Sequence, residues 1–220
     1  MRPSSEHEVL IPAGSVSLRG DLTIPPAPIG AVLFAHGSGS SRSSPRNRRV
    51  AWWLNQARMA TLLFDLLTPL EERHRGNVFD VPLLGSRLQT ATLWLEMLWQ
   101  QEGMADRLPL GYFGASTGAA AALWAAAELG NEIRAVVSRG GRPDLAGPRL
   151  AQVTAPTLLI VGELDPVVIV LNEQARAQMR CPTELVIIPG AGHLFEEPGA
   201  LDHVARVAAE WFNRHFGTEG

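Results

Sequence analysis

The residues most suited to chemistry in this sequence surround a single serine. The stretch Gly114-Ala115-Ser116-Thr117-Gly118 matches the G-x-S-x-G pattern, in which a strand-to-helix turn holds a serine in a strained, exposed conformation. Because no side chain stands two residues before or after the serine, a strand and a helix can meet at close range. The N–H groups at the start of the following helix would face any negative charge beside Ser116. The pattern therefore predicts a nucleophile beside an anion site.

The residues on either side of this motif help to decide whether it is functional, because small residues around a serine are common. Residues 108–113 form a short apolar run before it, and residues 119–129 form an alanine-rich helical stretch after it, closed by Gly130. The strand, the turn and the helix that the motif requires are thus all present. We therefore expect Ser116 to be catalytic.

A serine hydroxyl needs an imidazole to accept its proton and a carboxylate to fix the tautomer of that imidazole. Asp165 lies just past the apolar run 157–161, and His193 lies in the loop that follows the next run, 184–188. Both are expected at the same edge of the sheet as Ser116. Their order along the chain is nucleophile, acid, histidine, which is the order in hydrolases with this type of turn.

Other residues compete for these two roles. Glu163 or Asp144 could be the acid in place of Asp165, which precedes a proline and could merely shape a turn. His193 is better placed than His7 near the N-terminus, His74 in a charged loop, and His203 and His215 inside the last predicted helix. Cys181 is a spare thiol on this interpretation. No H-E-x-x-H motif or cysteine pair predicts a metal site.

A second glycine-rich loop, residues 36–41, follows the apolar run 31–35. A dinucleotide-binding fingerprint would need a third glycine at position 42, where Arg42 stands. The loop fits an oxyanion hole better, and we assign its two backbone N–H donors to Ser38 and Thr117, with Gly39 as the alternative to Ser38. His36 is interpreted as part of the loop architecture and not as a catalytic residue.

Strands and helices alternate along the chain. We expect strands at 9–11 and 15–22 (an antiparallel edge pair), 31–35, 61–66, 108–113, 133–138, 157–161 and 184–188. We expect helices that begin at 45, with Ser44 as N-cap, and at 80, with a stop at Gly103, and further helices at 119–129, 168–179 and 200–216. This alternation predicts an α/β fold of three layers, with a mostly parallel central sheet and helices on both faces. In such sheets the loops beyond the carboxyl ends of the strands carry the chemistry.

Length and composition limit the alternatives. The 220 residues predict one domain, 1–220, and the net charge of −3 gives no reason to expect nucleic acid. All 19 basic residues are arginine, so neither a Walker A lysine nor a Schiff-base lysine is available, and no cofactor is expected. No apolar run predicts a membrane span, and the N-terminus lacks the apolar core of a secretory signal. With a single cysteine, these features predict a cytoplasmic protein. A homodimer is left open.

Taken together, these motifs resemble the α/β-hydrolase superfamily, and within it the dienelactone-hydrolase-like small serine hydrolases. The resemblance runs from about Ala31 to Phe216 and rests on His36-Gly37, residues 114–118, residues 162–165 and Gly192-His193. It implies Ser116 as nucleophile, His193 as general base and then acid, and Asp165 as the orienting carboxylate. The segment also resembles hydrolase domains that in some proteins are joined to a phosphoribosyltransferase domain.

The resemblance implies a serine carboxylesterase that cleaves small esters through an acyl-enzyme intermediate. Dienelactone hydrolases proper use a cysteine nucleophile, so the serine here favours ordinary ester cleavage. A thioesterase or acyltransferase would use the same three residues, and a non-catalytic binding protein on this fold is the rival from another class. The expected partner is a small-molecule ester.

The connection between the strands at 133–138 and 157–161 is short, so no lid domain is expected and the site should be open and shallow. Arg139 and Arg142 lie on this connection, and other loops at the same edge carry further arginines (Arg42, Arg46, Arg73 and Arg75). These arginines could form a solvated surface in an arginine-biased chain. The sharper hypothesis is that Arg139 or Arg142 binds a carboxylate or phosphate of the substrate by paired hydrogen bonds.

Overall fold

The computed structural model describes residues 5–101 and 108–217, and its centre is one eight-stranded sheet. The strand order is β1-β2-β4-β3-β5-β6-β7-β8. The strands are β1 (Ser5–Ala13), β2 (Val16–Ile24), β3 (Gly30–Ala35), β4 (Met59–Phe64), β5 (Leu110–Ala115), β6 (Ile133–Arg139), β7 (Thr157–Gly162) and β8 (Thr183–Ile188). All eight strands predicted from the sequence are confirmed.

The pairing of the strands sets the position of the site. β1 and β2 form an antiparallel hairpin at one edge of the sheet, as predicted, and β2 pairs antiparallel with β4. All other neighbours, from β4 through β3 to β8, are parallel. The carboxyl ends of β3 to β8 therefore lie along one edge of the sheet, and the loops that follow them meet there.

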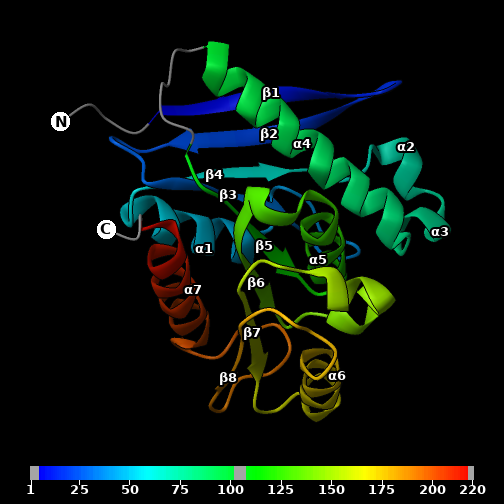
Figure 1. The fold of residues 1–220 in the computed structure, drawn as a ribbon, viewed down its shortest axis with the longest axis vertical. Helices are drawn as coiled ribbons and strands as arrows, with labels where there is room; N and C mark the ends of the chain where they lie inside the picture. Colours follow the sequence, from blue (N-terminus) through cyan, green and yellow to red (C-terminus); the bar gives the residue numbers. More distant parts are fainter. Residues whose placement is uncertain (1–4, 102–107, 218–220) are drawn as a thin grey trace.

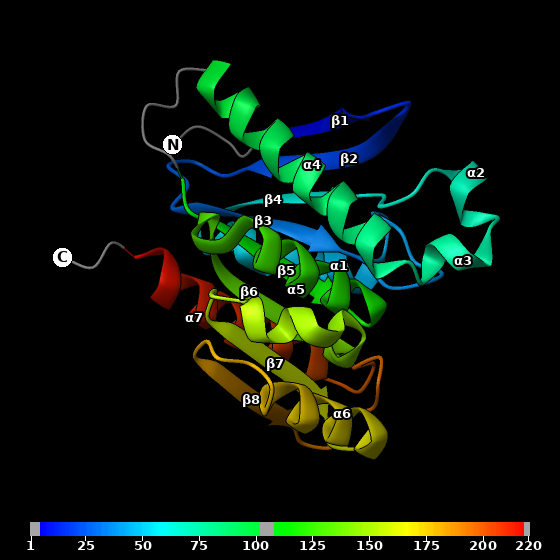
Figure 2. The ribbon, with the colours of Figure 1, turned by 45° about the vertical axis from the view of Figure 1, so that its right-hand side comes forward.

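Helices cover both faces of the sheet (Figures 1 and 2). The helices are α1 (Pro45–Gln56), α2 (Pro69–Glu72), α3 (Arg75–Val78), α4 (Val81–Gln101), α5 (Thr117–Leu129), α6 (Pro166–Arg176) and α7 (Ala200–Phe216), with 3-10 segments η1 (Gly130–Glu132) and η2 (Pro143–Gln152). α1 and α7 pack together on one face, and α4 and α5 pack together on the other. This is the three-layer arrangement that the sequence predicted.

Burial on both faces explains why the central strands are continuous apolar runs. Val32 and Phe34 of β3 pack into the core layer under α1 and α7. Leu33 and Ala35, which alternate with them, pack into the layer under α4 and α5. Side chains of a strand point alternately to its two faces, so a strand covered on both sides is apolar at most of its positions.

Side chains that cap the helices fix where the loops leave the sheet. Ser44 accepts a hydrogen bond from the N–H of Asn47 at 3.4 Å and Pro45 opens α1, which confirms the predicted helix start. Asp80 Oδ1 accepts from the N–H of Leu83 at 3.0 Å at the start of α4. The predicted stop of that helix at Gly103 lies outside the described residues.

No lid is inserted between β6 and β7. That connection is the 3-10 segment η2, which is kinked at Gly147 and packs against α5 and α6. The short helices α2 and α3, between β4 and α4, and the segment η2 were not predicted from the sequence. The two helices have only four residues each, and η2 is interrupted by a kink, so none of them shows a helical period.

Candidate active site

The turn that carries Ser116 has the backbone conformation that the motif predicts. Ser116 follows the last residue of β5 and precedes the first residue of α5, with φ 52° and ψ −123°. A positive φ is unfavourable for a residue with a side chain and is found where the surrounding structure enforces it. Here the Ser116 N–H donates to the Arg139 carbonyl at 3.2 Å, and the Ser116 carbonyl accepts from the Arg142 N–H at 3.0 Å. The predicted strained turn is confirmed.

The glycines of the motif are required by the close approach of strand and helix. A Cβ at position 114 would lie 2.5 Å from the Cα of Ala119. A Cβ at position 118 would collide with the carbonyl oxygen of Ala35, at the end of β3. At Gly37, in the neighbouring loop, a Cβ would lie 2.9 Å from the Cβ of Ser116. The small residues thus let three segments pack around the serine.

An imidazole and a carboxylate meet beside this turn. Asp165 follows β7 and precedes α6, and its Oδ2 lies 2.6 Å from Nδ1 of His193, in the loop after β8. The Asp165 side chain is 16% exposed and the His193 side chain is 41% exposed. With Nδ1–H donating to the carboxylate, Nε2 of His193 is left as a base.

Ser116 and His193 line one pocket of about 260 Å³. Its other lining groups include the guanidinium-bearing residues Arg46 and Arg139 and the serines Ser38, Ser40 and Ser44. Among the described residues Ser116 Oγ makes no hydrogen bond to His193; such bonds are often long in ligand-free enzymes and tighten when substrate binds. The arrangement can support attack by a hydroxyl on a small, polar acyl compound.

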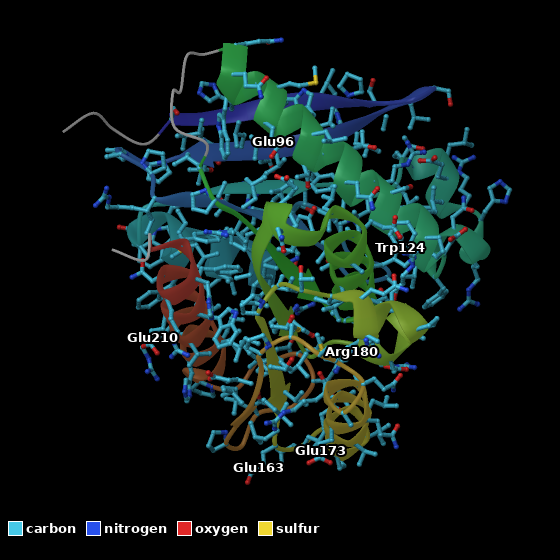
Figure 3. The ribbon with its side chains drawn as sticks, viewed as in Figure 1. Glu96, Trp124, Glu163, Glu173, Arg180 and Glu210 are labelled. Carbon is cyan, nitrogen blue, oxygen red and sulfur yellow. The ribbon has the colours of Figure 1, made fainter. Side chains whose placement is uncertain are left out.

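The alternative acids are held elsewhere. Both carboxylate oxygens of Asp144 accept from Arg142, at 2.9 and 2.8 Å. Glu163 lies at the surface beyond β7 and β8 (Figure 3), where its carboxylate accepts from the N–H of Gly190 at 2.7 Å. Only Asp165, of the three carboxylates considered, hydrogen-bonds to His193.

The two predicted oxyanion donors have different surroundings. Thr117 is the first residue of α5, where the N–H has no partner within the helix. The N–H of Ser38 donates to Oγ1 of Thr117 at 2.9 Å, so that donor is engaged. The assignment of Ser38 and Thr117, with Gly39 as alternative, stays a prediction.

His36 has the role of a loop anchor. Its Nε2 accepts from the N–H of Leu66 at 3.1 Å, so Nδ1 carries the proton and donates to the Gly37 carbonyl at 3.0 Å. Both ring nitrogens are therefore engaged, and the side chain is buried. It joins the loops after β3 and β4, as the interpretation from the sequence required.

The two candidate substrate-binding arginines differ sharply. Arg142 uses two donors on Asp144 and does not line the pocket. Arg139 ends β6, lines the pocket and is only 6% exposed. Burial, and secondly the charge of nearby Arg46, lower the pKa of Arg139 to about 10, so it is still cationic at neutral pH. Arg42 lies elsewhere, bonded to Glu8, Asp21 and Asp65 of the β1–β2–β4 edge.

Sequence reasoning missed two residues that contact the arginines of the pocket. Phe195 has its ring centroid 5.7 Å from the Arg139 guanidinium carbon, and Glu196 ion-pairs with Arg46 at 3.1 Å. Both follow His193 within three residues. The sequence does show an aromatic residue and two acidic residues shortly after His193, but only the fold shows which arginines these residues contact.

In the part of the chain that the structure describes, no group of three or more histidine, cysteine, aspartate or glutamate side chains could hold a metal ion. The same residues include no helix with the length and hydropathy needed to cross a membrane.

Two curated proteins of Mycobacterium tuberculosis, from strains CDC 1551 and H37Rv, are similar to this chain. Each is 58% identical to it over 213 residues, which are 97% of this chain and 47% of the relative. Both carry the provisional name of a phosphoribosyl transferase. The chain thus spans about half the length of the curated relatives that it matches. No protein-family model matches the chain.

Solved structures are also similar. A crystal structure of a dienelactone hydrolase from Anabaena variabilis is 55% identical, with a TM-score of 0.91 over 97% of this chain and 99% of that one. Est1E from Butyrivibrio proteoclasticus is 15% identical, with a TM-score of 0.75 over 94% and 98%. An esterase from Pyrococcus furiosus is 17% identical, with a TM-score of 0.74 over 97% and 92%. The last two, at such low identity, show the fold alone.

Proposed function

Because the chain belongs to the α/β-hydrolase superfamily, in its dienelactone-hydrolase-like group, we propose that it is a serine hydrolase that cleaves small carboxylic esters. The observation that supports this most is the contact of 2.6 Å between His193 Nδ1 and Asp165 Oδ2, beside a serine on a strained strand-to-helix turn. Ser116 is the nucleophile, His193 the base and then the acid, and Asp165 the orienting carboxylate.

The proposed reaction has two stages. Ser116 Oγ gives its proton to Nε2 of His193 and attacks the ester carbonyl; the tetrahedral intermediate collapses to an acyl-enzyme as His193 returns the proton to the leaving alcohol. Water then gives a proton to His193 and attacks the acyl carbonyl. The second tetrahedral intermediate collapses with cleavage of the bond to Ser116 Oγ, which takes the proton back from His193 as the acid is released. The N–H groups of Thr117 and Ser38 are the proposed donors to the oxyanion, with Ser38 leaving its bond to Thr117 Oγ1.

The transferase name of the relatives does not argue against ester cleavage by this chain. The chain spans only about half of the Mycobacterium tuberculosis proteins, so their name is no guide to the activity of the matched half. A thioesterase or an acyltransferase would use the same three residues, with a different leaving group or acceptor. The small, polar pocket supports short acyl groups in each case.

Covalent labelling tests the proposed nucleophile. A fluorophosphonate should label the wild-type protein and fail to label Ser116→Ala. The control is Ser43→Ala, which removes an exposed hydroxyl from the nearby loop and should leave labelling intact. In parallel, the wild type should hydrolyse methyl and ethyl esters of short acids, and Ser116→Ala should lose at least about 10³-fold in kcat. Equal labelling of wild type and Ser116→Ala would reject Ser116 as the nucleophile.

A further inference from the structure

One charged side chain in the nucleophile pocket has no counter-ion. Among the described residues Arg139 makes no ion pair, and its Nε is buried without a hydrogen-bond partner. The guanidinium lies against the ring of Phe195 and lines the same pocket as Ser116 and His193. The residue is only 6% exposed, so water covers little of its charge.

Burying a charge without a partner is unfavourable, and proteins normally pair such a group or place it at the surface. The aromatic ring of Phe195, which the Arg139 guanidinium contacts, replaces only a small part of the hydration that the guanidinium loses on burial. A guanidinium that faces a cavity with unused donors is instead suited to a planar or tetrahedral oxoanion, which accepts two hydrogen bonds at once.

A second cation of the pocket is only loosely held. Arg46 lies in the first turn of the 12-residue helix α1, where the helix dipole disfavours positive charge and favours an anion. Its partner, Glu196, is 66% exposed and lies in the loop that carries His193. An exposed pair of this kind contributes little stability, so a ligand anion can displace Glu196 from Arg46.

We propose that Arg139 and Arg46 form an oxoanion subsite in the nucleophile pocket, and that the substrates are short esters carrying a carboxylate or phosphoryl group near the ester carbonyl. This inference rests on the proposed function of Ser116. Glu196 is the displaceable counter-ion, because it occupies Arg46 until the substrate anion arrives. Ser40 and Ser44, which also line the pocket, are available as neutral donors to the same anion.

The size of the pocket limits the length of the substrate. The pocket volume of about 260 Å³ has room for a short acyl chain with one charged end. A long aliphatic chain would have to extend into solvent. The subsite therefore selects for charge and for short length together.

The test uses three methyl esters of similar length: methyl butyrate, monomethyl succinate and methyl 3-phosphonopropionate. Methanol release by proton NMR gives kcat/KM for the wild type and for Arg139→Met, Arg46→Gln and Glu196→Gln. The matched control is Arg142→Gln, whose side chain is paired with Asp144 outside the pocket. Activity on methyl butyrate reports the proposed chemistry without the subsite.

We expect the wild type to prefer one or both anionic esters, and the ratio of anionic to neutral kcat/KM to fall about 10- to 100-fold in Arg139→Met. Arg46→Gln should lose less, and Glu196→Gln should gain on the anionic esters. Preference for succinate identifies a carboxylate subsite, and preference for phosphonate a phosphoryl subsite. An unchanged ratio of anionic to neutral kcat/KM in Arg139→Met would overturn the proposal.

A binding measurement separates this inference from the proposed function. Ser116→Ala cannot form an acyl-enzyme, so calorimetric titration of that variant with monomethyl succinate and with inorganic phosphate measures the subsite alone. Binding that disappears in Ser116→Ala/Arg139→Met supports the subsite even if no ester is turned over. If the wild type is labelled at Ser116 but Ser116→Ala binds neither anion, the subsite is refuted and the proposed hydrolase function is unaffected.

Discussion

Asp165 Oδ2 lies 2.6 Å from Nδ1 of His193, although 28 residues separate them along the chain. This contact fixes the tautomer in which Nε2 is free to accept a proton. Asp165→Asn keeps the shape of the side chain but can present an N–H to Nδ1, which would favour the wrong tautomer. We expect kcat for ester hydrolysis to fall by about 10³- to 10⁴-fold with little change in KM.

The matched variants for this test are Asp144→Asn and Glu163→Gln, because these carboxylates were the rival candidates and are bonded elsewhere. Both should keep kcat within about threefold of the wild type, as is usual for surface substitutions. If Asp144→Asn or Glu163→Gln were as damaging as Asp165→Asn, the assignment of the acid would have to change.

Gly118 is predicted to be indispensable for folding of the turn. A Cβ there would collide with the carbonyl oxygen of Ala35, and neither backbone segment can move without disturbing β3 or α5. Gly118→Ala should lower the free energy of unfolding by about 1–3 kcal/mol. Gly76→Ala is the control, since no atom lies within 4 Å of the added Cβ. Urea unfolding of both variants gives the comparison, and equal midpoints would contradict the packing argument.

Thr117 ties the predicted oxyanion loop to the nucleophile turn through the bond from the Ser38 N–H to its hydroxyl. Thr117→Val removes the acceptor and should lower kcat by about tenfold, because without this hydrogen bond of ~1 kcal/mol the loop that carries Ser38 is no longer held beside the nucleophile turn before its N–H moves to the oxyanion. Thr117→Ser keeps the hydroxyl and should restore most of the loss. Steady-state kinetics on one neutral ester checks both; a fully active Thr117→Val would show that the tie is unimportant.

The sequence predicted that Ser116, Asp165 and His193 lie at one edge of the sheet, because each follows an apolar run and parallel strands share their carboxyl edge; their catalytic roles stay a prediction. It predicted equally well the helix start at Ser44, where a cap and a proline act locally. Local signals of this kind predict the folded structure well because they depend only on residues that are neighbours in the chain.

Other features of the site depend on contacts between distant segments and could not be read from the chain. The bond between Ser38 and Thr117 spans 79 residues, and nothing near either residue indicates it. Arg139 and Arg142 looked equivalent in sequence, but the last position of β6 faces the pocket and the position three residues later meets Asp144. The pair of Arg142 with Asp144 is local, whereas the burial of Arg139 involves its packing against Phe195 of the distant loop that carries His193.

Glu71 gives a prediction about pH. Burial alone would raise its pKa, but hydrogen bonds from Thr68 and the charge and hydrogen bond of Arg87 outweigh burial and lower the pKa below its usual value of 4.5. A lowered pKa stabilises the fold above pH 4.5, and this contribution is lost as the pH falls through the folded-state pKa. Glu71→Gln should therefore be less stable than wild type at pH 7, and the two stabilities should converge as the pH falls below 4.5 and through the lowered pKa of Glu71.

Thermal unfolding of wild type and Glu71→Gln between pH 3 and pH 7 measures this convergence. Glu72→Gln is the neighbouring control, because among the described residues its carboxylate makes no ion pair or side-chain hydrogen bond. Its unfolding temperature should follow that of the wild type at every pH. A constant difference between Glu71→Gln and wild type across the range would mean that the Glu71 carboxylate does not titrate differently in the folded protein.

Arg139 should destabilise the ligand-free protein. The folded state holds its guanidinium in a buried position with an unpartnered Nε, and burial lowers its pKa to about 10. Arg139→Met keeps a flexible chain against Phe195 and removes the charge, so the free energy of unfolding at pH 7 should rise by about 1–3 kcal/mol. Because the charged form is disfavoured in the fold, the advantage of the variant should shrink as the pH rises from about 10.

Urea unfolding at pH 7 and at pH 10.5 measures both parts of this prediction, with Arg142→Met as the control that instead loses a paired side chain and should be no more stable than wild type. Added succinate or phosphate should stabilise the wild type and leave Arg139→Met unaffected, because a ligand that binds only the folded protein raises its stability. A variant less stable than wild type at pH 7 would show that Arg139 supports the fold through contacts that outweigh its buried charge.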